Sequence, residues 1–193
     1  MKKILILVLV AWVCSHSLHG QTLEFSKENV VFQLDSVHFL VTADLFLKNT
    51  TNQSSTQTLF FPYSCEGHII KVDSVSIFDA NLNVNIKPAR RNQAGVLFSL
   101  LFSPQEIKKV KIIYSQDHDG RLAGYVITKV KYWQGHLDQA NYTLNVNSPS
   151  IVIDSTAYKP NQTINENGKD LYKWNKTNFK PEKEFCIYFH LKK

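Results

Sequence analysis

The chain has 193 residues, of which 22 are Lys or Arg and 16 are Asp or Glu, so its formal net charge is +6 at pH 7. This positive excess is mild and is spread along the sequence. Its tightest cluster, Lys87, Arg90 and Arg91, is too short to follow a phosphate backbone, and nucleic-acid binding is therefore not expected.

The first twenty residues have the layout of a secretory signal peptide. Lys2 and Lys3 precede an apolar run from Ile4 to Val13, and polar residues then lead to Gly20. The run is about half of the roughly 18 apolar residues that a membrane-spanning helix needs, so we expect no transmembrane segment in the mature chain. Cys14 leaves a lipoprotein open, but no small residue stands just ahead of it, which favours free secretion. We expect export to the periplasm, the outer surface or the medium.

Residues 21–193 are numerous enough to build one hydrophobic core, and no stretch within them is typical of a linker. We therefore expect a single domain after a signal peptide at 1–20. Two cysteines remain, Cys65 and Cys186, in a compartment where disulfides form. The spacing allows either a bridge between them or two unpaired thiols.

Apolar residues alternate with polar ones in several segments. A period of two places one side of a strand in a core and the other in water. The alternation is clear at 37–47, 82–86, 140–146 and 185–191. Further strands are expected at 32–34, 59–61, 72–78, 96–102, 110–114, 125–133 and 151–153, with turn-rich pieces between them. About ten short strands without a long helical period predict an all-β sandwich or barrel.

One segment has a competing interpretation. Ser103 and Glu106 have the spacing of a helix capping box, and Ile107, Val110 and Tyr114 could share a helical face. The same residues also fit a strand, because Val110, Ile112 and Tyr114 alternate. We expect one turn there, followed by a strand.

The second half of the chain carries a family resemblance. The segment 125–133 is followed by the strand 140–144 and by Ser148 and Pro149, and the ending combines 172–174, 178–181 and a last apolar strand through 187–189. This arrangement resembles a group of secreted bacterial domains of unknown function, of the kind found in Bacteroidota. The resemblance implies an immunoglobulin-like antiparallel β-sandwich of about ten strands. It implies no activity, and it assigns Trp174 and Phe179 to the core.

The residue patterns of known catalytic and metal sites are not found in the sequence. Neither His-Glu-x-x-His nor Gly-x-Ser-x-Gly occurs. Cys65 and His68 are too close in sequence for the usual thiolate and base pair, and 117–120 is interpreted as a plain turn rather than a calcium loop. We expect no catalytic residues, no metal and no cofactor. The histidines of the mature chain stand singly: His38, His68, His118, His136 and His190.

The function expected from these observations is an exported, non-catalytic binding, adhesion or accessory module of the bacterial envelope or surface. Its partner, a protein or a glycan, is not identified by the sequence. Ligand contact is expected at Tyr132, Trp133 and His136, where an aromatic side chain must lie partly outside the core. The alternative is an envelope hydrolase with a site assembled from distant loops. It would have a pocket with perturbed titratable groups near 65–68 or 117–119.

Overall fold

The computed structural model describes residues 22–63, 71–132, 135–166 and 169–192, so the predicted signal peptide lies outside the described residues. The described chain is nearly all strand, with one short 3-10 helix, η1 (Thr128–Tyr132). The strands are β1 (Leu23–Leu34), β2 (His38–Asn49), β3 (Ser55–Pro62), β4 (Val72–Asp79), β5 (Val84–Asn85), β6 (Arg90–Asn92), β7 (Gly95–Phe102), β8 (Ile107–Asp117), β9 (Leu122–Tyr125), β10 (Leu137–Val146), β11 (Ile151–Thr156), β12 (Gln162–Glu166), β13 (Lys169–Phe179) and β14 (Phe185–Leu191).

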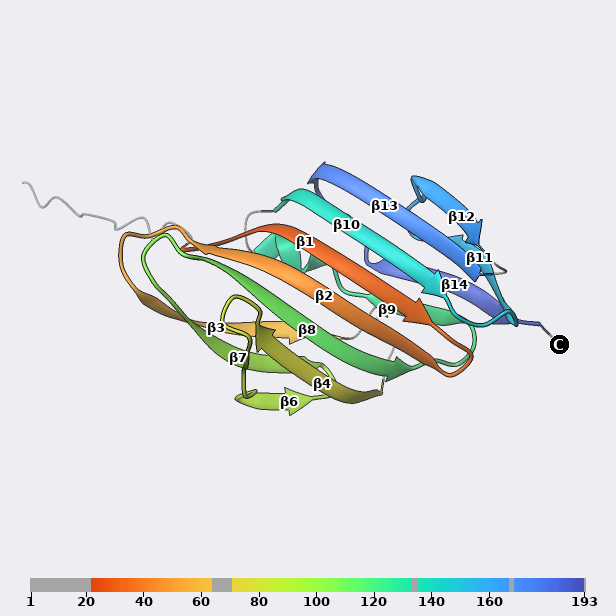
Figure 1. Ribbon diagram of the computed structural model, residues 1–193, viewed down its shortest axis with the longest axis horizontal. Helices are drawn as coiled ribbons and strands as arrows, with labels where there is room; N and C mark the ends of the chain where they lie inside the picture. The colour runs from red at the N-terminus through yellow and green to blue at the C-terminus, as the bar shows by residue number, and fades with distance from the viewer. Residues whose placement is uncertain (1–21, 64–70, 133–134, 167–168, 193) are drawn as a thin grey trace, which may run out of the picture.

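The strands form one large sheet and two small ones. The large sheet has eight strands in the order β12-β13-β10-β1-β2-β8-β4-β5, and the small sheets have the orders β11-β14-β9 and β3-β7-β6. In Figure 1 the large sheet runs across the whole molecule, β3, β7 and β6 lie toward one end of it, and β14 and β9 lie toward the other. This arrangement confirms the predicted all-β sandwich.

One strand pair departs from antiparallel pairing. At the centre of the large sheet β1 runs parallel to β10, with Val30 opposite Tyr142 and Phe32 opposite Leu144. The other pairs are antiparallel within the described residues. Parallel neighbours cannot be joined by a hairpin, so the two central strands come from distant parts of the chain.

The two-residue alternation predicted for the long strands is confirmed by burial. Along β2 every second side chain from Phe39 to Leu47 is buried, and β8 and β10 follow the same pattern. Phe32, on β1, lies in the middle of the core, with ring centroids 5.3 Å from Phe39 and 5.1 Å from Phe185. Trp174 is fully buried and Phe179 packs against the same core, as expected.

Two predicted strands are wrong in extent. Only Val84 and Asn85 form a strand in 82–86, and Leu82 and Val84 are 67% and 54% exposed, because this piece is the outer edge of the sheet. In 125–133 the strand stops at Tyr125 and η1 follows. The Glu184 carboxylate accepts hydrogen bonds from the N–H groups of Ile127 and Thr128, which caps the start of η1 as an N-cap would.

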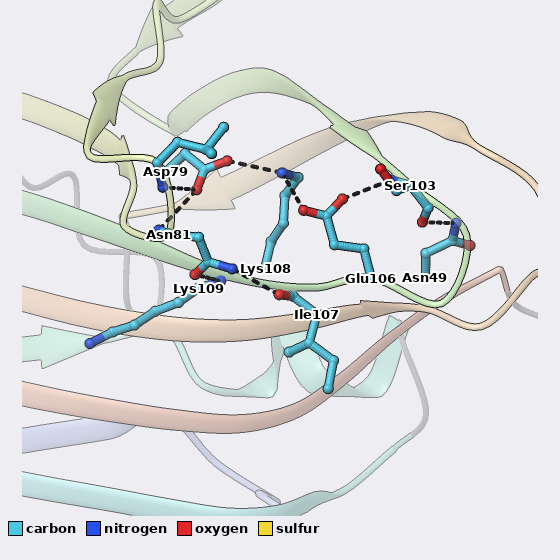
Figure 2. Close-up of polar contacts among 9 residues, drawn as sticks. Asn49, Asp79, Asn81, Ser103, Glu106, Ile107, Lys108 and Lys109 are labelled. Carbon is cyan, nitrogen blue, oxygen red and sulfur yellow. Dashed lines mark hydrogen bonds and ion pairs between the residues drawn. The ribbon is translucent and has the colours of Figure 1, made fainter.

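The segment with two interpretations is one turn followed by β8, as expected. The hydrogen bond expected of a capping box is present although no helix follows: the Glu106 carboxylate accepts from the Ser103 N–H at 2.7 Å. Figure 2 shows Lys108 placed between Glu106 and Asp79, with Nζ 2.8 Å and 3.0 Å from their carboxylate oxygens. Asp79 also accepts from the Asn81 N–H at 3.0 Å. These contacts fasten the turn between β4 and β5 onto the start of β8.

Cys186 is buried on β14. Cys65, the other cysteine of the possible bridge, lies outside the described residues. Both alternatives, a bridge and two unpaired thiols, therefore stay open.

Candidate functional site

A cavity of about 730 Å³ opens between β3 and the segment that follows β9. We call it the β3 cavity. This volume lies within the range of about 300 to 1,000 Å³ that is typical of ligand pockets. Its lining mixes apolar side chains with hydroxyl, amide and charged groups: Thr22, Leu23, Gln57, Thr58, Leu59, Phe60, Pro62, Val126, Thr128, Lys129 and Glu184.

The wall formed by β3 carries an aromatic ring that water reaches. Phe60 is 50% exposed although it lies in a regular strand. Its ring sits across Gly95 of β7, since a Cβ atom built on Gly95 would lie 2.6 Å from the ring edge and 2.4 Å from the Phe61 carbonyl oxygen. Glycine at 95 therefore allows the close approach that holds the Phe60 ring at the cavity.

The opposite wall is fixed by Glu184. Its carboxylate accepts from the main-chain N–H groups of Ile127 and Thr128 at 2.8 and 3.1 Å, and from the Thr128 hydroxyl. The charge of Glu184 is thus engaged in holding η1. The carboxylate acts as a structural anchor of this wall.

A buried charged cluster lies beneath the cavity. Lys129 points inward, with Nζ 2.6 Å from the Val126 carbonyl oxygen, 2.9 Å from the Tyr125 hydroxyl and 3.6 Å from a Glu28 carboxylate oxygen. Glu28 is fully buried on β1 and also accepts from the hydroxyls of Tyr125 and Tyr142. Two hydrogen bonds and an ion pair therefore hold the Lys129 ammonium within the protein.

The burial of this cluster changes its titration. Burial lowers the pKa of Lys129, and the Glu28 charge opposes that change. Burial, together with the neighbouring Glu28 charge, raises the pKa values of Tyr125 and Tyr142 well above 10.0. Tyr63 directly follows β3, and burial raises the pKa of its hydroxyl to about 12.

We expect the fold to be lost steeply above pH 10. The pKa values of Tyr63, Tyr125 and Tyr142 are higher in the folded chain than the ordinary 10.0, so their neutral forms stabilise the fold fully below pH 10 and progressively less as pH rises through the folded values. Lys129 acts in the opposite sense, because its pKa is lowered, but its contribution is complete by pH 10.5. A pH titration followed by tyrosinate absorbance and circular dichroism measures this. Ionisation of all tyrosines near pH 10 with an intact fold would contradict it.

The residues predicted to touch a ligand are only partly described. Trp133 and the side chain of Tyr132 lie outside the described part of the chain. His136 is half-buried and its Nε2 lies 3.4 Å from Asp138 Oδ1. His136 is not among the described residues that line the β3 cavity, although η1, which ends at Tyr132, contributes Thr128 and Lys129 to it. Ligand contact at Tyr132, Trp133 and His136 stays a prediction.

A second group of polar side chains lies at the far end of β2 and β8. Ligand atoms of His38, Asp73 and Asp117 all lie within 4.8 Å of one another. Lys71 already occupies the space between the two carboxylates, with Nζ 3.2 Å from Asp73 and 3.3 Å from Asp117. The group is exposed, and this ammonium neutralises part of its charge, so we assign it no metal.

The hydrolase alternative placed its site near 65–68 or 117–119. The first segment lies outside the described residues. The second is a turn in which both ring nitrogens of His118 are engaged, one with the Asp35 carbonyl oxygen and one with the Gly120 N–H. Gly120 has a φ of 79°, which supports the interpretation of a plain turn. Residues 117–119 do not line the β3 cavity, and among the described residues this cavity is the place that the structure favours for a ligand.

Comparisons with known proteins concern the fold. No family model and no curated protein matches the sequence. The crystal structure of a "putative nutrient binding protein" from Legionella pneumophila is similar with a TM-score of 0.66 and 12% identity over 88% of this chain and 67% of that chain. An M1 zinc metallopeptidase from Deinococcus radiodurans has a TM-score of 0.48 and 10% identity over 88% of this chain and 42% of that one. The chain thus spans less than half the length of that peptidase. No helix among the described residues could span a membrane. In its fold, this chain is similar to the Legionella protein.

Proposed function

We propose that the chain is an exported, non-catalytic binding protein of the bacterial envelope or surface, and that its ligand occupies the β3 cavity. The observation that carries this proposal is a cavity of about 730 Å³ that combines an exposed aromatic ring with amide and hydroxyl groups. Such a mixture is typical of sites that hold a ligand by apolar contact and orient it by a few polar groups.

The charged groups of the cavity support binding rather than catalysis. Lys129 donates to two acceptors of the protein and forms an ion pair with Glu28, and Glu184 accepts from three donors. A general acid or base must reach the reacting group of a substrate, and both of these side chains are committed elsewhere. The shared fold with a protein described as nutrient binding agrees with this proposal.

The proposal is tested with mature chain, residues 21–193, and a panel of soluble glycans, amino acids and peptides in a thermal-shift assay. A ligand that prefers the folded state raises the melting temperature. Phe60→Ala is expected to weaken its affinity about tenfold, because the ring loses apolar contact worth roughly 1.4 kcal/mol. Leu101→Ala is the matched control, since Leu101 is also exposed, at 66%, and lies outside the cavity.

Two results would contradict the proposal. One is binding that Phe60→Ala leaves unchanged. The other is chemical conversion of the ligand by the purified chain, seen by mass spectrometry, which would favour the hydrolase alternative.

A further inference from the structure

The cavity lies off the edge of β3 rather than on one of its faces. Four consecutive residues of β3, 57 to 60, line it. Because successive side chains of a strand point to opposite faces, one face could supply only alternate residues. Consecutive lining residues therefore place the main-chain edge of β3 at the cavity.

Among the described residues, that edge has no partner strand. In the order β3-β7-β6, β3 is the terminal strand and pairs with β7 alone. The other small sheet also ends nearby, since β9 is its terminal strand and the Tyr125 ring of β9 lies 6.2 Å from the Phe61 ring of β3. The cavity thus lies between the open edge of β3 and the segment that follows β9.

The register tells which main-chain groups face the cavity. Tyr63 donates its N–H to Ala94 at 3.1 Å, and Pro62 lies opposite Gly95. Hydrogen-bonded and non-bonded positions alternate along an antiparallel pair. Residues 57, 59 and 61 therefore bond to β7, whereas the N–H and C=O groups of Thr56, Thr58 and Phe60 point away from it. Within the described residues, no other group bonds to those of Thr58 and Phe60.

Resting on the proposed function, we propose that the ligand is a polypeptide segment in extended conformation, supplied by a partner protein, that pairs with β3 as a fourth strand. Strand addition uses main-chain donors and acceptors for affinity and pockets beside them for alternate side chains. The cavity offers both, because the exposed Phe60 side chain and the buried Leu59 side chain lie on opposite faces of β3 and both line it. Its charged side chains leave room for a neutral main chain, because Lys129 is paired with Glu28 and the Glu184 carboxylate accepts from three donors of the protein.

The sequence itself supplies a way to test this. Proline lacks an N–H and is tolerated in edge strands where that N–H would face outward. Pro62 already stands at such a position. Thr58→Pro should therefore remove one outward donor while keeping the bonds to β7. Thr58→Val, which keeps the N–H, is the matched control.

The probe is an octapeptide selected from a random phage-displayed library on the mature chain and then synthesised. Calorimetry is expected to show binding about tenfold weaker to Thr58→Pro and unchanged to Thr58→Val. Circular dichroism checks that both variants fold. If Thr58→Pro does not fold, a scan of the peptide by N-methylation tests the same point with the unaltered protein. Affinity is expected to fall at every second peptide residue.

Several outcomes would overturn strand addition. An N-methylation scan without a two-residue period would do so, as would full affinity for a folded Thr58→Pro. A library that yields no Phe60-dependent peptide, while a glycan or amino acid binds in a Phe60-dependent manner, would overturn it and leave the proposed function standing. Failure of every ligand class to bind would overturn both.

Discussion

Replacing Lys129 by methionine is expected to lower the free energy of unfolding by about 3 kcal/mol. The change leaves the carboxylate of Glu28 fully buried with only the hydroxyls of Tyr125 and Tyr142 as partners. Breaking a buried ion pair by removing one partner costs about 3 to 5 kcal/mol, because the remaining charge stays uncompensated in a medium that solvates it poorly. Urea denaturation at pH 7 measures the loss.

The double variant Glu28→Leu with Lys129→Met separates pairing from packing. Two apolar side chains of similar volume leave no isolated charge, so we expect stability to return to within about 1 kcal/mol of the unaltered chain. Lys180→Met, at an exposed position, is the control for loss of a positive charge. A Lys129→Met protein as stable as the unaltered chain would show that the pair does not hold the fold.

The second large effect is expected at Phe32. Its ring lies 5.3 Å from Phe39, 5.5 Å from Tyr125 and 5.1 Å from Phe185, so it contacts side chains of the large sheet and of one small sheet. Phe32→Ala removes these contacts and leaves a cavity, which costs about 3 to 5 kcal/mol. For a chain of this size, the melting temperature should fall by roughly 10 °C.

Val31→Ala provides the matched control for Phe32→Ala. Val31 is the preceding residue of the same strand and points to the other side, where it is partly exposed. We expect its replacement to change the melting temperature by less than about 2 °C. Equal losses at the two positions would mean that the sandwich does not close over this face of β1.

The long amphipathic strands were predictable because each has one buried face and one solvent-facing face, which makes apolar and polar residues alternate in the sequence. Strand β1 was predicted only at 32–34, although it runs from Leu23 to Leu34. A register shift between Phe25 and Lys27 moves the buried positions from odd to even numbers and interrupts the two-residue period. At one of the even positions stands Glu28, a charged residue where the pattern demands an apolar one. Strand β13 was missed because most of its side chains are polar and only Trp174 is fully buried.

The candidate site could not be predicted from the sequence. Its lining comes from the start of β1, from β3, from the segment after β9 and from Glu184, and no local spacing connects these pieces. Buried charges such as Glu28 and Lys129 concentrate at functional or strained positions, but their burial is seen only in the structure. Single-sequence reasoning had no means to know that both would be buried.

The parallel pairing of β1 with β10 has a consequence for how the chain reaches its final state. Asn29 and Asn141, which bond across this pair, are separated by 112 residues. The middle of the large sheet therefore cannot close until almost three quarters of the polypeptide has been made available. Contacts of such long separation impose a large entropic cost before they yield any gain, and they are associated with slow folding. During synthesis β1 must wait, with one edge unpaired, until β10, the tenth of the fourteen described strands, has been made.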